Sequence, residues 1–140
     1  MMTKIGLCIL MMFPLYLSAQ DGTVIEKNRY TIDDSIWTQV NTYNPELARR
    51  IRDSVDFYRI TYLSDGLKVI GYIAEPKAMA SYPCIIANRG GNRDSGRWNP
   101  LSIVYFLGQM ASWNYVVIAS QYRGNEGGEG IEEFGGQEVN

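Results

Sequence analysis

The chain has 140 residues, of which 46% are hydrophobic and 20% are charged, a composition typical of one soluble globular domain rather than of a disordered chain. Its 13 basic and 15 acidic side chains nearly balance, so the charge gives no reason to expect nucleic acid as a partner. The 140 residues include no histidine, so they supply neither an imidazole base for a serine or cysteine nucleophile nor a histidine metal ligand.

Residues 1–19 have the organisation of a secretory signal peptide. MMTK is a short basic start, IGLCILMMFPLYL is an apolar run, and SAQ supplies a small residue for cleavage. The apolar run is shorter than the roughly 20 residues that span a bilayer. We therefore expect a secreted or periplasmic protein with no membrane attachment after cleavage. The mature chain would keep only Cys84, which excludes an intramolecular disulfide, and the apolar neighbours of Cys84 predict a buried thiol.

Residues 20–57 are predicted to form an N-terminal arm that ends in a short helix. The first part, to about Asn44, is polar and is expected to be irregular, anchored by the aromatic residues Tyr30, Trp37 and Tyr43. Asn44 and Pro45 then provide an N-cap and a proline at the first helical position. The helix carries an apolar stripe and an opposite face that we expect to be solvated. The stripe is Leu47, Ile51 and Val55, and the solvated face is Arg49, Arg50 and Arg52.

The next segment predicts a β-hairpin. FYRITYL and LKVIGYIAEPK each alternate between residues for two faces of a sheet, as half-buried strands do. Ser64-Asp65-Gly66 lies between them and has the composition of a tight turn. The two strands are therefore expected to pair antiparallel.

A strand, a helix and a second strand follow the hairpin. PCIIAN and YVVIAS are continuous apolar runs, which predict strands buried on both faces of a sheet. Between them, Asn99-Pro100 begins a helix with an apolar stripe, and Asn114 fits the left-handed exit from that helix. A βαβ unit of this kind predicts two parallel strands with a right-handed crossover.

The glycine loop NRGGNRDSG, residues 88–96, follows the first of these buried strands. It matches neither G-x-G-x-x-G nor G-x-x-x-x-G-K-[ST], which disfavours nucleotide binding. Two interpretations of Gly90-Gly91 remain open. The glycines either let the backbone approach a substrate, as in the oxyanion loop of α/β hydrolases, or merely permit a tight turn before the helix.

Four blocks in order make the chain resemble a known family. SDGLKVIGYIAEPK, YPCIIANRGGNRDSG, YVVIASQYRGNEGGEG and EEFGGQEVN are similar to the start of the catalytic domain of prolyl oligopeptidase-type serine peptidases, including bacterial secreted dipeptidyl and acylaminoacyl peptidases. The resemblance implies an α/β fold, with an incomplete α/β-hydrolase sheet built from an antiparallel entry hairpin and a parallel βαβ unit. It assigns residues 58–140 to the N-terminal part of that domain and the oxyanion loop to Arg89, Gly90 and Gly91.

The roles of the loop arginines stay open. Family members often carry Tyr or His where this chain has Arg89, whose guanidinium can either donate to an oxyanion or act as a structural pin between loops. Arg93 and Arg97 are near enough to contact a substrate terminus. The alternative is that they pair with Asp94 or with the glutamate-rich loop that follows residue 124.

The family's catalytic triad has no counterpart in these residues. None of Ser95, Ser102 and Ser120 lies in a G-x-S-x-G context, and no histidine is present. We therefore expect the 140 residues to be inactive by themselves, as the N-terminal portion of a serine hydrolase that acts on peptides or small esters without metal or cofactor. The segment between residues 20 and 57 is too short for the family's β-propeller. The alternative is a non-catalytic secreted binding module that holds an acidic ligand in its Arg/Gly loop.

Overall fold

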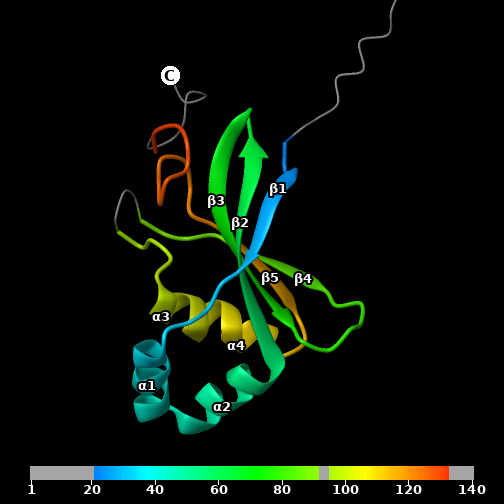
Figure 1. Cartoon of the computed structure of the whole chain (residues 1–140), viewed down its shortest axis with the longest axis vertical. Coiled ribbons are helices and arrows are strands. Elements are labelled where there is room, and N and C mark those ends of the chain that lie inside the picture. Colours follow the sequence, from blue (N-terminus) through cyan, green and yellow to red (C-terminus); the bar gives the residue numbers. More distant parts are fainter. Residues whose placement is uncertain (1–20, 92–94, 133–140) are drawn as a thin grey trace, which may run out of the picture.

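The computed structural model describes residues 21–91 and 95–132. They form a mixed α/β fold with one five-stranded sheet in the order β1-β2-β3-β5-β4 (Figure 1). The strands are β1 (Val24–Arg29), β2 (Val55–Ser64), β3 (Leu67–Pro76), β4 (Cys84–Ala87) and β5 (Val116–Ser120). The helices are α1 (Asp34–Tyr43), α2 (Pro45–Ser54), α3 (Pro100–Ser102) and α4 (Gln109–Ala111), and a π-helical segment, Ile103–Gly108, joins α3 to α4. The predicted signal peptide and the block EFGGQEVN lie outside the described residues.

The N-terminal arm is ordered, and the prediction of an irregular segment was wrong. β1 pairs antiparallel with β2, and α1 begins where Asp33 accepts a hydrogen bond from the Ser35 N–H at 2.8 Å. All six residues of β1 are exposed, so its sequence lacks the alternation that would have revealed a strand. Tyr43 is 82% exposed and does not anchor the arm.

The helix predicted at Asn44-Pro45 is confirmed as α2. The Asn44 side chain accepts a hydrogen bond from the Leu47 N–H at 3.0 Å, and Pro45 occupies the first turn. The arginine face is only partly solvated, because Arg50 Nε donates to Ser112 Oγ at 3.2 Å at the end of α4. Arg52 also lies over the ring of Trp37.

The hairpin and its turn are confirmed. β2 and β3 pair antiparallel along their whole length, from Val55 opposite Pro76 to Ser64 opposite Leu67. Asp65 and Gly66 both have positive φ, 49° and 75°, in the turn between them. A tight turn of this kind fixes the register of the two strands.

The parallel unit is confirmed in its pairing and corrected in its burial. β4 pairs parallel with β5, Asn99 caps α3, and Asn114 exits α4 with a φ of 67°. β4, however, is an edge strand that pairs only with β5. One of its two faces is not covered by the described residues, and Ile86 on that face is 74% exposed. Cys84 is likewise exposed, contrary to the prediction of a buried thiol.

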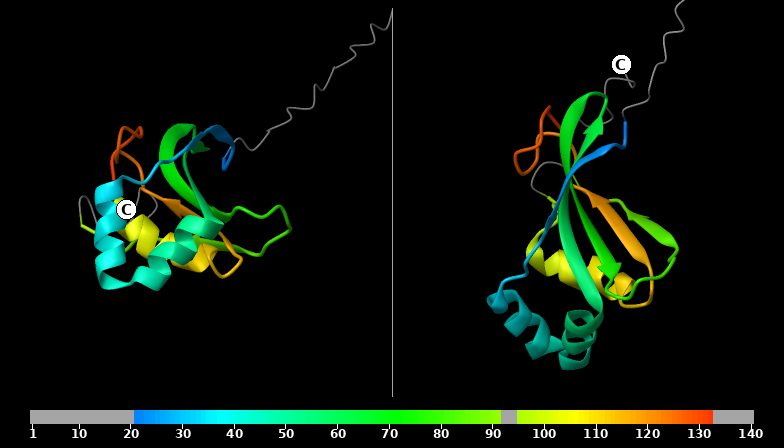
Figure 2. Two further views of the ribbon diagram at one scale, coloured as in Figure 1. Left: turned by 60° about the horizontal axis from the view of Figure 1, so that its bottom comes forward. Right: turned by 45° about the vertical axis from the view of Figure 1, so that its right-hand side comes forward.

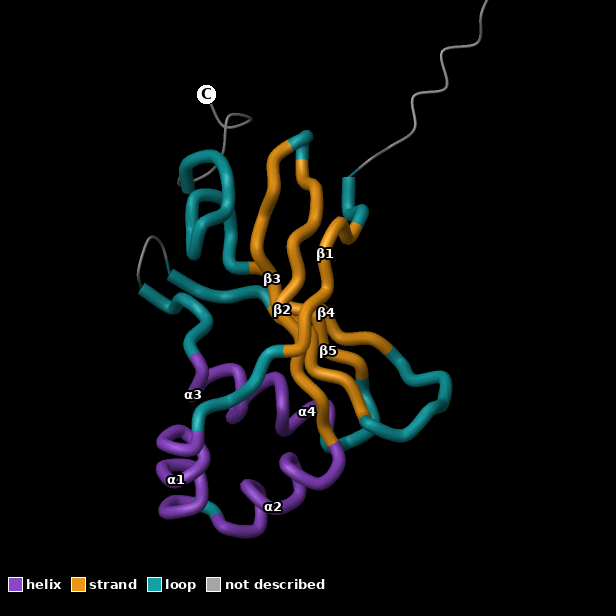
Figure 3. Tube along the Cα trace, in the orientation of Figure 1, coloured by secondary structure: helices purple, strands orange, loops and turns teal. Residues whose placement is uncertain are grey.

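The core lies between one face of the sheet and the helices (Figures 2 and 3). α2 and the helix that runs from α3 to α4 pack on this face through Ile51, Phe57, Val104, Leu107 and Val117, all buried. At Gly108 the helix lies so close to the sheet that a Cβ would be 2.8 Å from Phe57 Cζ. In the part of the chain that the structure describes, no helix has the length and hydropathy needed to cross a membrane.

Candidate functional site

The candidate site lies where the two parallel strands end. β4 ends at Ala87 and β5 at Ser120, and the loops that follow these residues leave the same edge of the sheet (Figure 1). The first loop contains Gly90 and Gly91 and leads to α3. Ligands of open α/β sheets bind outside the carboxyl ends of their strands, so these loops are the candidate site.

The two glycines differ in what surrounds them. Gly91 has a φ of +75°, and a Cβ on it would lie 2.5 Å from the Ser95 carbonyl oxygen. A Cβ on Gly96, which also has positive φ, would overlap the carbonyl oxygen of Gly90. The described residues on the two sides of the loop therefore lie close together, and Gly91 and Gly96 both need to be glycine. Gly90 is exposed, and apart from its chain neighbours no described atom lies within 4 Å of the position that its Cβ would take, so the place of a side chain there is open.

Arg89 connects the two loops. Its side chain has no exposed surface and donates to the carbonyl oxygens of Gln121 at 3.2 Å and Ser95 at 3.3 Å. The guanidinium also forms an ion pair of 3.2 Å with Glu132 and lies 4.9 Å from the ring centroid of Tyr122. In return the Tyr122 hydroxyl donates to the Arg89 carbonyl at 2.7 Å. These contacts are those expected of a structural pin between loops.

Gln121 is the residue of this site that the sequence did not indicate. It is fully buried, and its side chain accepts from the Trp98 N–H at 2.9 Å and donates to the Trp98 carbonyl at 2.7 Å. Its signal in the sequence is a polar residue directly after the apolar run YVVIAS. That signal is weak, because polar residues commonly follow strands.

The remaining predicted residues are less informative. Arg93 and Asp94 lie outside the described residues. Arg97 is exposed on the loop that carries Gly90. Ser102 completes the cap of α3 with Asn99, and Ser120 Oγ is 2.8 Å from the Tyr62 hydroxyl, so these two serines have structural partners.

The loop after β5 is held along the β2–β3 hairpin, where the views agree in placing it (Figures 1 and 2). The Tyr72 hydroxyl donates to the Glu126 carboxylate, and Arg59 donates to the Glu126 carbonyl at 3.0 Å. Burial and, after it, the bond to Glu126 raise the pKa of Tyr72 above the ordinary tyrosine value. The Glu129 N–H donates to the Lys68 carbonyl at 2.7 Å. Two residues of the glutamate-rich loop, Glu126 and Glu129, thus hold the loop against the hairpin.

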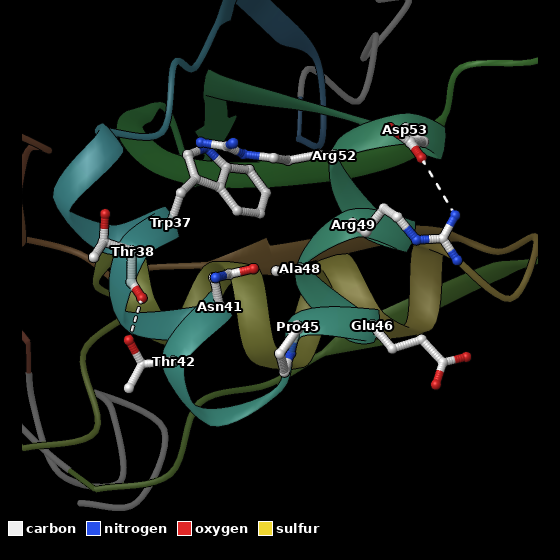
Figure 4. A pocket seen from close by; sticks show the side chains of 10 residues that line it. All are labelled: Trp37, Thr38, Asn41, Thr42, Pro45, Glu46, Ala48, Arg49, Arg52 and Asp53. Carbon is white, nitrogen blue, oxygen red and sulfur yellow. Dashed lines mark hydrogen bonds and ion pairs between the residues drawn. The ribbon is translucent and has the colours of Figure 1, made fainter.

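A hollow of about 870 Å³ lies elsewhere, between α1 and α2 (Figure 4). Three of its four charged side chains interact with neighbours: Arg49 forms an ion pair with Asp53, and Arg52 covers Trp37. It is lined by Trp37, Thr38, Asn41, Thr42, Pro45, Glu46, Ala48, Arg49, Arg52 and Asp53. This open, polar hollow contains no serine, cysteine or histidine, so we place the candidate site at the glycine loop. No group of three or more metal-ligating side chains occurs among residues 21–91 and 95–132.

Comparisons with known proteins support a peptidase-like chain. No family model matches. Over 84 residues the chain is 44% identical to the uncharacterized peptidase YtmA of Bacillus subtilis (strain 168), a match that covers 60% of this chain and 31% of that protein. Over 61 residues it is 28% identical to a 2,3-dihydroxy-2,3-dihydro-p-cumate dehydrogenase of Pseudomonas putida, covering 44% of this chain and 24% of that protein.

The chain spans less than one third of the length of these curated relatives. The two names differ, and the peptidase match is both longer and more identical. The glycine loops also lack the G-x-G-x-x-G spacing of a dinucleotide site. The match to the protein named as a peptidase is therefore the stronger of the two.

Proposed function

We propose that these residues are the N-terminal portion of a secreted serine hydrolase, a peptidase or esterase of the prolyl oligopeptidase type, and that their glycine loop supplies its oxyanion site. The observation that carries the proposal is the position of Gly90. It lies in a turn fixed at the carboxyl edge of two parallel strands, with open space where a side chain would be. The likeness to a protein named as a peptidase supports the reaction class.

The chemistry follows from the needs of acyl transfer. Attack on an ester or amide carbonyl creates a tetrahedral intermediate with a negatively charged oxygen, which fixed backbone N–H donors stabilise. A glycine without a nearby side chain lets a substrate carbonyl approach such donors. Because the Arg89 guanidinium is buried against Glu132 and two carbonyls, the proposal assigns the donors to the loop backbone and leaves Arg89 as the pin.

In this proposal the catalytic triad, which includes the nucleophile, lies in residues beyond Asn140. A serine hydrolase of this type needs a serine on a G-x-S-x-G turn, then an acid and a histidine. The substrate is a peptide or a small ester, and the mechanism uses no metal or cofactor. Residues 1–19 act in this proposal as the signal peptide that directs the protein to the periplasm or the outside of the cell.

The nucleotide sequence after the Asn140 codon tests the proposal first. We expect an in-frame G-x-S-x-G segment followed by Asp and His codons. An immediate stop codon would refute the proposal and favour the binding-module alternative. The product of the complete reading frame should then react with a fluorophosphonate probe, which labels an activated serine, whereas residues 1–140 alone should not.

Gly90→Ala tests the role of the loop in that complete protein. Apart from its chain neighbours, the methyl group meets no described atom within 4 Å, so the fold should persist while access of the substrate carbonyl to the loop is reduced. We expect kcat for ester hydrolysis to fall about 10-fold to 100-fold, less than the roughly 100-fold to 1000-fold loss that follows removal of an oxyanion donor, because the backbone donors stay in place. Ser81→Thr is the matched control, since it adds one methyl group at an exposed position before β4, at the opposite edge of the sheet. Equal activity of the two variants would contradict the assignment.

A further inference from the structure

Gln121 fixes both ends of the glycine loop. Its backbone carbonyl accepts from Arg89, the residue before Gly90, at 3.2 Å. Its side-chain amide forms a matched pair of hydrogen bonds, 2.9 Å and 2.7 Å, with the N–H and the carbonyl of Trp98, the residue before the cap of α3. Arg89 and Trp98, which flank the glycine loop, are thus both hydrogen-bonded to one residue.

Gln121 is itself fixed to the sheet. Its N–H donates to the Ile70 carbonyl at 2.9 Å, which extends the pairing of β3 with β5 by one residue. The side chain is fully buried, so water does not compete for its bonds to Trp98. A primary amide matches a backbone peptide group in shape, with one donor and one acceptor side by side. No charged or shorter side chain reproduces this pairing at neutral pH.

The hydrogen bonds of its side chain give Gln121 a role that a residue which only fills the core would not have. An apolar side chain of equal volume would keep the packing and would leave the Trp98 N–H and carbonyl buried without their partner. Buried peptide groups seek hydrogen bonds, so the loop stem would move until these groups found new partners. The displacement would reach Gly90, because Arg89 directly precedes it and because the Gly90 carbonyl lies against Gly96, two residues before Trp98.

We infer that Gln121 is a positioning residue of the oxyanion loop. It holds the loop at the carboxyl ends of β4 and β5. The inference rests on the proposed function of that loop. Gln121 acts through its hydrogen bonds to Arg89 and Trp98 and does not itself touch the substrate. Its effect is on the geometry of the transition state, where a displacement of about 1 Å costs on the order of 100-fold in rate.

The test uses the protein encoded by the complete reading frame. Gln121→Met removes both side-chain bonds at nearly unchanged volume, and we expect kcat for ester hydrolysis to fall about 100-fold while KM stays the same. Hydrogen exchange of the Trp98 amide should become faster. Gln121→Glu is the conservative variant: burial favours the neutral acid, which can accept from the Trp98 N–H and donate to its carbonyl, so we expect it to regain most of the lost kcat.

Val117→Ala is the control for a general loss of stability. Val117 is fully buried in β5, and the variant should lower the melting temperature while leaving kcat at 25 °C unchanged. If Gln121→Met retains the original kcat, or if Val117→Ala lowers kcat equally, the positioning role is refuted while the hydrolase assignment stands. If the unsubstituted protein neither binds the fluorophosphonate probe nor hydrolyses esters, the proposed function fails first.

Discussion

Replacing Gly91 with alanine tests the conformation on which the candidate site depends. The residue has a φ of +75°, a region that costs an L-amino acid with a side chain about 1–2 kcal/mol. The new Cβ would also lie 2.5 Å from the Ser95 carbonyl oxygen, a backbone atom that cannot rotate away. Relieving an overlap of this kind costs about 1–3 kcal/mol. Together these effects predict a loss of about 3 kcal/mol in the free energy of unfolding.

Urea unfolding of the purified protein, followed by tryptophan fluorescence, measures this loss. The same loss should lower the melting temperature by about 12 °C at about 4 °C per kcal/mol. Gly90→Ala is the neighbouring control, because its Cβ meets nothing within 4 Å, and its unfolding free energy should change by less than about 1 kcal/mol. If Gly91→Ala is as stable as the unsubstituted protein, or if both alanines destabilise equally, the described turn is wrong.

Three further substitutions test other parts of the structure. Asn44→Ala removes the side chain that caps α2 and should cost about 1 kcal/mol in urea unfolding; no loss would contradict the cap. Gly108→Val should cost about 1–3 kcal/mol, because a Cβ would lie 2.8 Å from Phe57, and a neutral result would show that the helix is not packed so closely. The raised pKa of Tyr72 means that the hydroxyl keeps its proton more firmly in the folded state than in the unfolded state. The contribution of this hydroxyl to the free energy of unfolding is therefore fully present below about pH 10 and is lost as the pH rises above that value. Tyr72→Phe should therefore flatten the alkaline decrease in melting temperature, and an unchanged decrease would contradict a Tyr72 hydroxyl that burial and the bond to Glu126 keep protonated.

The elements that could be predicted are those specified by neighbours in the sequence. A proline after asparagine begins α2 and α3, and Ser64-Asp65-Gly66 turns the hairpin, because caps and turns depend on residues only a few positions apart. The parallel pairing of β4 with β5 also followed, since a strand-helix-strand unit has few possible arrangements. The resemblance that placed the glycine loop depends on the order of such local blocks.

What the sequence alone determined is thus the succession of elements and the place of a glycine loop after a strand. Only the tertiary structure decided that β1 joins the sheet, that Cys84 is exposed on an edge strand, and that the Arg89 side chain is buried between two loops. Two of these depend on a partner distant in the chain: β2 for β1, and Gln121, 32 residues away, for Arg89. The third depends on the edge position of β4, where the described residues leave Cys84 uncovered. Burial and pairing are properties of surroundings, and those surroundings exist only when the chain has folded.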